Sequence, residues 1–257
     1  MRSLALVSQF GDAVEYVFVG GESVTGGLRV GGTELLGLTG RHMLISVLAL
    51  AAAAAVCVPL GLYLGHHGRG GVLAINVSNV GRAVPPLALM GLFIAFLGIG
   101  MLNMTVVLAL LALPAILTNT YVGIRQVDRD TVDAARGMGL TEGQIVRRVE
   151  LPLALSTIFG GVRTSAVIVV ATAVIAPLGS VDTLGTPIIN ENVHGPAGQL
   201  GASMVIAALT LVTDAGLGLV QRAVTPRGVK LTVPEPARGR GPGKLIPAIL
   251  RRRAQPT

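Results

Sequence analysis

The chain alternates long apolar runs with short polar segments. The clearest run covers residues 43–65. As an α-helix it would be about 34 Å long, which is enough to cross a hydrocarbon core of about 30 Å. Similar runs predict further helices over about residues 72–100, 104–121, 156–178 and 200–220. The pattern therefore predicts an all-α membrane protein with about five transmembrane helices.

Polar residues and prolines break the second of these runs. Asn76, Asn79 and Arg82 interrupt its first half, and the pair Pro85-Pro86 follows. Arg82 has two interpretations: a functional charge inside the membrane, or a side chain that extends to the cytoplasmic interface. We expect a broken span whose second half covers residues 87–97, and a tight turn at residues 101–103 before the third helix.

Composition and charge support a membrane protein. Hydrophobic residues make up 51% of the 257 residues and charged residues 13%, and the mean hydropathy is +0.71; about a quarter of a typical soluble domain is charged. Most of the net charge of +7 lies in residues 125–148 and in the tail after Arg222, both beside apolar runs. This placement is typical of cytoplasmic segments next to anionic lipid, and it argues against nucleic acid as a partner. The single cysteine, Cys57, is expected to be a packing residue.

The distribution of Lys and Arg also predicts the orientation. Residues 66–71, 123–152 and the tail carry the cations, whereas residues 179–199 contain no Lys or Arg. The N-terminus is therefore expected outside and the C-terminus in the cytoplasm, although Arg41 argues against this orientation.

The same pattern divides the chain into three parts. Residues 1–42 are expected to form an extracytoplasmic or interfacial segment, in which the apolar run after Arg2 is too short for a cleavable signal. Residues 43–222 form the transmembrane domain. Residues 223–257 are rich in Pro, Gly and Arg and are expected to be a disordered basic tail in the cytoplasm.

Candidate chemical groups within the chain are few. His66 and His67 are neighbours without a third ligand, so solvated side chains are favoured over a metal site. Asp214 is either a proton-relay carboxylate or, as the nearby Arg222 favours, an ion-paired residue near the cytoplasmic interface. The stretch 239–244 fails the phosphate-loop pattern, and no catalytic constellation is evident. We therefore expect no enzyme activity and no cofactor in this chain.

The polar segment 123–152 contains signals for two short helices. Asp130 is expected to cap the first helix, which glycines at 137 and 139 end. Thr141 begins the second, with Gln144 as its capping-box partner, and Pro152 is expected to end the unit. A solvated loop is the alternative, but it would not need consecutive caps, so we predict a docking surface.

The spacing in this segment matches a known motif. Asp133-Ala134-Ala135, three residues, Gly139, nine residues and then Val149-Glu150-Leu151-Pro152 resembles the EAA motif of ABC-importer permeases, with Asp in place of Glu and Val in place of Ile. In that family the motif forms coupling helices that sit in a groove of the ATPase subunit. The resemblance implies coupling roles for Asp133, Ala134, Ala135, Gly139, Leu140, Thr141, Val149, Leu151 and Pro152.

The resemblance covers about residues 40–222 and implies the type I importer permease fold in a prokaryotic cell membrane. It implies three partners: ATPase subunits that bind ATP and Mg, a second permease subunit, identical or paralogous, and an extracytoplasmic solute-binding protein. The flanking sequence is similar to permeases for glycine betaine, choline, carnitine and proline betaine. An importer of methionine or another amino acid is the first alternative. A secondary transporter or channel, or a membrane scaffold without transport, is favoured less, because no clear intramembrane relay or repeated half is evident.

Overall fold

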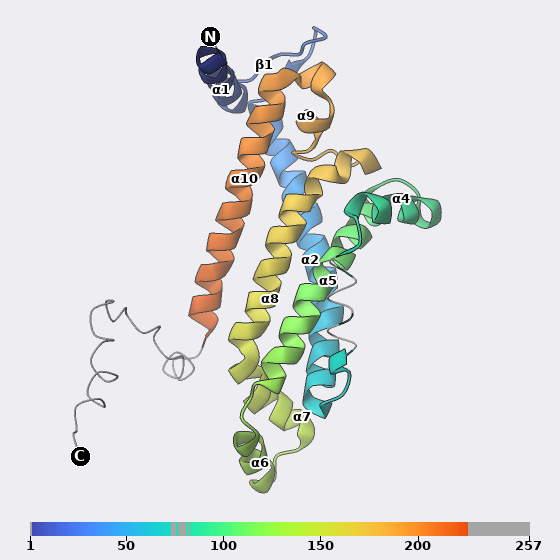
Figure 1. Ribbon diagram of the computed structural model, residues 1–257, viewed down its shortest axis with the longest axis vertical. Coiled ribbons are helices and arrows are strands. Elements are labelled where there is room, and N and C mark those ends of the chain that lie inside the picture. The colour runs from blue at the N-terminus through green and yellow to red at the C-terminus, as the bar shows by residue number, and fades with distance from the viewer. Residues whose placement is uncertain (1, 73–75, 77–80, 82, 226–257) are drawn as a thin grey trace, which may run out of the picture.

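The computed structural model describes residues 2–72, 76, 81 and 83–225. Its main body is a bundle of long helices that run along the same axis (Figure 1): α2 (Thr33–His67), α5 (Met101–Arg125), α8 (Leu151–Thr172) and α10 (Glu191–Val224). In the described residues, four helical stretches are long and apolar enough to cross a membrane: Thr33–His67, Met101–Arg125, Glu142–Gly179 and Glu191–Val224. The helical bundle confirms the predicted all-α membrane class.

The centre of the bundle is formed by α2, α5 and α8. Small residues allow α2 and α5 to approach closely, since a Cβ atom at Gly61 would lie 2.7 Å from Cβ of Thr120, and one at Gly65 would lie 2.8 Å from Cβ of Ile124. Such glycines are a common device for packing helices in membranes. Fully buried apolar side chains fill the space between the helices, among them Ile45, Met104, Leu108, Ile116 and Val169.

The described residues between α2 and α4 (Pro86–Leu97) lie along α5. A side chain at Gly71 would meet the hydroxyl of Tyr121, and one at Gly81 would meet Pro114, which is nearer the N-terminal end of α5. These contacts follow α5 back towards α4, in agreement with a broken second span. Arg82 lies outside the described residues, so both interpretations of its charge stay open.

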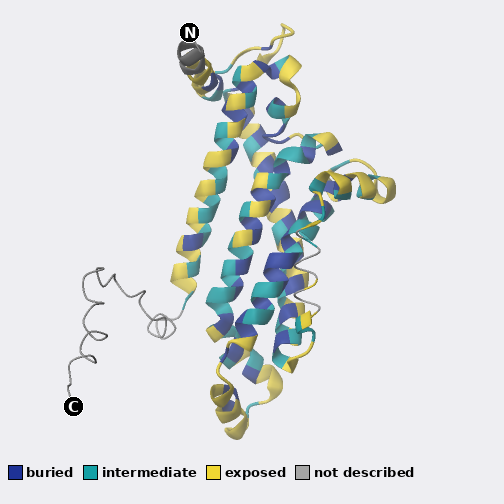
Figure 2. Ribbon diagram, viewed as in Figure 1, coloured by how far each residue is buried: buried dark blue, intermediate teal, exposed yellow. Residues whose placement is uncertain are grey.

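α10 stands at one side of the bundle. Figure 2 shows exposed residues along much of its length, whereas α5 is largely buried or intermediate. The exposed side chains of α10 include the apolar residues Leu211, Val212, Leu219 and Val220. This surface is apolar enough to face lipid or another membrane helix.

Several helix boundaries differ from the predicted ones. α2 begins at Thr33 and not at residue 43, because His42 is buried within it and its Nε2–H donates to the carbonyl of Val170 at 2.8 Å. α5 begins at Met101, and the predicted turn at 101–103 instead lies at Gly98–Gly100, where both glycines have positive φ. The predicted external loop 179–199 contains α9 (Thr186–Ile189) and the first turns of α10.

α8 also ends earlier than the predicted boundary at residue 178. The α-helix stops at Thr172 and continues as a 3-10 helix, η2 (Ala173–Gly179), which contains Pro177.

The N-terminal segment folds onto the end of the bundle that lies opposite the polar segment (Figure 1). It consists of α1 (Arg2–Phe18) and a two-stranded antiparallel hairpin, β1 (Gly21–Glu22) with β2 (Arg29–Val30). The buried hydroxyl of Tyr16 donates to Nδ1 of His194 at 2.8 Å, which joins α1 to α10. Residues 226–257, including most of the predicted disordered tail, lie outside the described residues.

Candidate functional site

The polar segment forms a helical unit at one end of the bundle. It contains α6 (Arg129–Gly137), α7 (Glu142–Ile145) and a π-helical turn, η1 (Val146–Glu150), which leads directly into α8. Figure 1 shows α6 and α7 at the end opposite α1. We call residues 128–150 the coupling segment below.

Local capping explains both short helices. The cap of α6 is Asp128, whose Oδ1 accepts from the backbone N–H of Asp130 at 3.0 Å, so the prediction of Asp130 as the cap is wrong. The capping box of α7 is confirmed, since both of its hydrogen bonds between Thr141 and Gln144 are present. Gly139 has φ +85, a left-handed conformation that favours glycine, and it turns the chain from α6 to α7.

The prediction that Pro152 ends the unit is also wrong. Glu150 and Leu151 both have helical backbone angles, and Pro152 lies in the first turn of α8. A proline is tolerated in a first turn, and the π-helical turn before it absorbs the change in hydrogen-bond register. Residues 142–150 of the coupling segment therefore continue into α8 without a break in helical backbone angles.

The motif residues divide into an outward and an inward set. Asp133, Ala134, Gly139 and Thr141 are exposed. Ala135 is 2% exposed and packs beside Val132, Ile124 and Ile145. Leu140, Val149, Leu151 and Pro152 are half-buried, and all but Pro152 pack against the same apolar cluster. Among the motif residues, the outward set presents exposed side chains to a partner at this face. The inward set packs the coupling segment against the bundle.

Ion pairs between charged side chains stabilise the outward surface. Arg136 Nη1–H donates to Asp133 Oδ1 at 2.8 Å, and Arg136 Nε–H donates to Glu142 Oε1 at 3.0 Å. The hydrogen bond to Glu142 raises the pKa of Arg136 above its usual range, and the charges of Glu142 and Asp133 raise it further. Arg136 therefore stays charged and links α6 to α7.

His66 adds a contact that the sequence pattern missed. Its Nε2 lies 3.1 Å from Glu142 Oε2, and its Nδ1 lies 2.8 Å from Glu150 Oε2. His66 is at the end of α2, so these contacts join α2 to the coupling segment. In the described residues no group of three or more His, Cys, Asp or Glu side chains could hold a metal ion.

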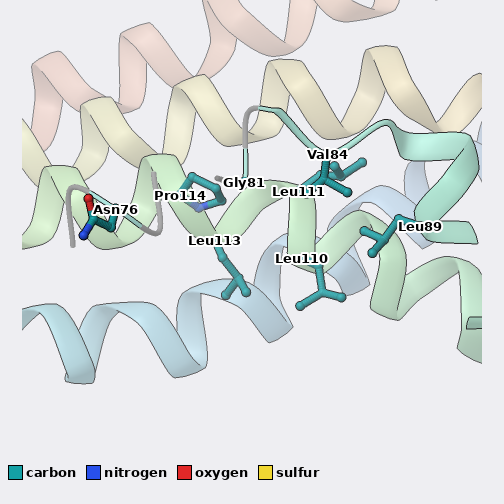
Figure 3. A pocket seen from close by; sticks show the side chains of 8 residues that line it. All are labelled: Asn76, Gly81, Val84, Leu89, Leu110, Leu111, Leu113 and Pro114. Atoms are coloured by element: carbon teal, nitrogen blue, oxygen red, sulfur yellow. The ribbon is translucent and has the colours of Figure 1, made fainter. Parts of the chain in front are cut away.

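A pocket of about 390 Å³ lies halfway along the bundle (Figure 3). The residues that line it are Asn76, Gly81, Val84, Leu89, Leu110, Leu111, Leu113 and Pro114. Asn76 is the one polar side chain in this set, and no charged group is among them. The described residues of the lining offer no counter-charge to an ionic solute, so we assign no ligand to this pocket.

The family model described as "Binding-protein-dependent transport system inner membrane component" matches residues 57–227. The chain belongs to this family. The match includes the whole coupling segment and the helices α5, α8 and α10. A member of this family is a multi-pass membrane permease and is not itself an enzyme.

Individual relatives cover most of the chain. The carnitine transport permease protein OpuCB of Listeria monocytogenes is 36% identical over 77% of this chain and 92% of its own length. The glycine betaine/carnitine/choline transport system permease protein OpuCB of Bacillus subtilis is 34% identical over 79% of this chain and 94% of its own length. A solved chain of the inward-facing MetNI methionine ABC transporter has a TM-score of 0.63 at 20% identity, covering 72% of this chain and 94% of that one. At that identity the likeness shows the fold alone, which is the fold of an ABC-importer permease.

Proposed function

We propose that this permease is the transmembrane subunit of an ATP-driven importer and that its coupling segment docks onto an ATPase subunit. The coupling segment itself carries the proposal: two capped helices present charged and small residues at one end of a membrane bundle. Ala134 is exposed and has no side chain beyond Cβ, so a partner's groove can approach the backbone of α6 there. Asp133 supplies an exposed charge beside it.

The continuity of the coupling segment with α8 supports a mechanical role. A displacement of α6 and α7 would be carried through the π-helical turn into α8, because the helical backbone continues from α7 into α8 without a break. Gly139 would keep the two short helices at a fixed angle, and Leu140, Val149, Leu151 and Pro152 would hold the unit against the bundle. ATP and Mg would be bound by the ATPase, whose hydrolysis supplies the energy.

We infer that the solute is a quaternary-ammonium compatible solute such as glycine betaine, choline, carnitine or proline betaine. The relatives at 34–36% identity are named as permeases for carnitine, choline and glycine betaine, and they align over more than three quarters of this chain. An extracytoplasmic binding protein would deliver the solute, and a second permease subunit would complete the path.

The proposed docking fixes the orientation. With the coupling segment in the cytoplasm, α1 and the β-hairpin at the opposite end lie outside, and the C-terminal end of α10 lies inside (Figure 1). The membrane is the cell membrane of a prokaryote.

Uptake into liposomes tests the function and the solute together. The permease is reconstituted with its ATPase and binding protein, and entry of radiolabelled glycine betaine, choline and carnitine is compared with that of methionine, with and without ATP. We expect ATP-dependent uptake of at least one of the three ammonium solutes. Uptake of methionine alone would overturn the solute class and leave the importer, whereas flux without ATP or ATPase would overturn the importer.

Site-specific cross-linking tests the docking surface. A photoreactive amino acid replaces Met138, which is 75% exposed beside Gly139, or Phe96, which is 77% exposed on α4 at the other end of the bundle. We expect a cross-link to the ATPase from position 138 and none from the matched position 96. A cross-link from position 96 alone would place the ATPase at the wrong end for this proposal.

A further inference from the structure

His66 is the last residue but one of α2, and its imidazole is held between two carboxylates. The side chain is 9% exposed. Glu142 of α7 lies 3.1 Å from Nε2, and Glu150 of the π-helical turn lies 2.8 Å from Nδ1. Glu142 begins α7, and Glu150 ends the π-helical turn that follows α7. One side chain of α2 therefore contacts both ends of this helical stretch.

The chemistry of imidazole makes this arrangement specific. A carboxylate only accepts hydrogen bonds, so the imidazole donates the bond between Nδ1 of His66 and Oε2 of Glu150. The side chain of Glu150 is 2% exposed, and a buried carboxylate without a donor is strongly unfavourable. His66 therefore provides the donor that Glu150 requires, and its Nε2 lies against Glu142 as well.

The contact extends to the outward surface of the coupling segment. Glu142 also accepts from Arg136, and Arg136 donates to Asp133 on the exposed face of α6. An unbroken series of polar contacts thus runs from the proposed ATPase surface to the end of α2. Its members are Asp133, Arg136, Glu142, His66 and Glu150. Further ionisable groups at this end of α2 include Arg125, whose guanidinium lies beside Gly68, and His67, whose ring lies 5.2 Å from that of His66.

The coupling segment follows α5 through residues 126–127 and leads directly into α8, but it is not adjacent to α2 in the chain, so His66 gives it a polar attachment to α2. We propose that His66 is a positioning residue that ties the coupling segment to α2, so that a displacement of α6 and α7 moves α2 and α8 together. Without this tie, the segment would keep the apolar packing of Val58 and Leu62 but lose its polar link to α2, so α2 would follow it less closely and ATP hydrolysis would proceed with less solute carried. The inference rests on the proposed function, because it assigns a role within the same coupling step.

The test is the number of solute molecules taken up per ATP hydrolysed, measured in the complete reconstituted transporter. His66→Ala removes both contacts. His66→Arg replaces the imidazole with a guanidinium, which is always charged and can donate to both carboxylates. His67→Ala is the matched control, because His67 is exposed and its Nδ1 bonds only the backbone carbonyl of Tyr63 within α2.

We expect His66→Ala to lower uptake per ATP about five-fold or more while the ATPase stays bound, His66→Arg to recover most of the ratio, and His67→Ala to match wild type. A merely structural histidine would lower assembly, uptake and hydrolysis together and leave the ratio unchanged, which would overturn the proposal. If His66→Ala does not assemble, Glu142→Gln is the second variant, since Glu142 is 57% exposed and its neutralisation leaves no buried charge unpaired. An unchanged ratio in Glu142→Gln would equally overturn it.

Failure of the proposed function has a different signature. In that case wild type itself shows no ATP-dependent uptake, and no ratio exists to compare. Wild-type uptake with equal ratios in all variants refutes the role of His66 alone.

Discussion

Arg163 of α8 and Asp214 of α10 form a two-pronged ion pair within the membrane bundle. Nε–H and Nη2–H of Arg163 each donate to a different carboxylate oxygen of Asp214 at 2.6 Å. Both residues lie well inside helices that are long enough to span a membrane, and their side chains are 37% and 39% exposed. A second polar contact lies nearby, where Gln221 donates to the carbonyl of Ser156 at 2.8 Å. These contacts hold α10, which otherwise has an exposed apolar surface, against α8.

Removing one partner of this pair should be worse than removing both. We expect Arg163→Ala to lower the amount of folded permease in the membrane, because Asp214 keeps a charge without a partner. The double variant Arg163→Met/Asp214→Leu should restore that amount, because apolar residues of similar size can replace an ion pair. The measurement is the yield of monodisperse protein from membranes at equal expression. Equal yields for wild type and Arg163→Ala would show that the pair does not hold α10 in place.

The effect of a substitution at Gly139 should depend on backbone strain alone. A side chain there meets no atom within 4 Å, but φ is +85. We expect Gly139→Ala to destabilise the α6–α7 turn by about 1 kcal/mol and Gly139→Asn to cost less, because Asn adopts the left-handed region more readily. Hydrogen exchange of amides in the coupling segment measures this directly, with faster exchange in the order Ala, Asn, Gly.

Gly143 offers the matched control for this effect. It also has open space around it, but its φ is not positive and it lies inside α7. Gly143→Ala should slow exchange slightly, since Ala favours a helix. Faster exchange in Gly143→Ala than in Gly139→Ala would contradict the strain argument.

Tyr16 should make the attachment of α1 sensitive to alkaline pH. Burial raises the pKa of Tyr16 above its ordinary value of 10.0, and the charge of Glu34 raises it further. Below pH 10 both the folded and the unfolded chain keep the phenol protonated; above it the unfolded chain loses the proton first, so folded-state stability falls as the pH rises. We expect the thermal stability of wild type to drop above this pH by more than that of Tyr16→Phe.

The same variant tests the hydrogen bond to His194. At neutral pH, Tyr16→Phe should cost about 1 kcal/mol, because the buried imidazole loses its partner. Tyr63→Phe is the control, since Tyr63 is 60% exposed. If Tyr63→Phe lost the alkaline sensitivity and Tyr16→Phe kept it, the assignment to Tyr16 would be wrong.

Local signals allowed much of the coupling segment to be predicted. The capping box of Thr141 and Gln144 depends on residues three apart, and the turn at Gly139 depends on one backbone angle. Asp128 and Asp130 carry the same local signal, so the sequence could not decide which of them caps α6. The sequence could not decide whether Pro152 ends one helix or begins another, because a proline can do either. The preceding π-helical turn gives no sequence signal of its own.

Long-range contacts account for what the sequence could not predict. The contact of His66 with Glu150 joins residues 84 positions apart. The sequence pattern starts the first span at residue 43, whereas α2 begins at Thr33, and the burial of His42 within it depends on the carbonyl of Val170, 128 positions away. The ion-paired state of Asp214 was predicted and is confirmed, but its partner is Arg163 and not the nearby Arg222.

Gly61 should be sensitive to a single added methyl group. Thr120 is fully buried, and its hydroxyl donates to the carbonyl of Ile116, so it cannot rotate away from a Cβ atom that would lie 2.7 Å from its own. We expect Gly61→Ala to separate α2 from α5 and to cost about 1–3 kcal/mol, seen as a lower melting temperature in detergent. Gly40→Ala, in the same helix with open space around it, should not lower the melting temperature, because Ala favours a helix. The double variant Gly61→Ala/Thr120→Gly removes the side chain that the new methyl group would meet, and it should recover part of the loss. If instead Gly40→Ala and Gly61→Ala lowered the melting temperature equally, the effect would belong to the added methyl group in general, such as its contact with lipid, and not to the close approach of α2 and α5.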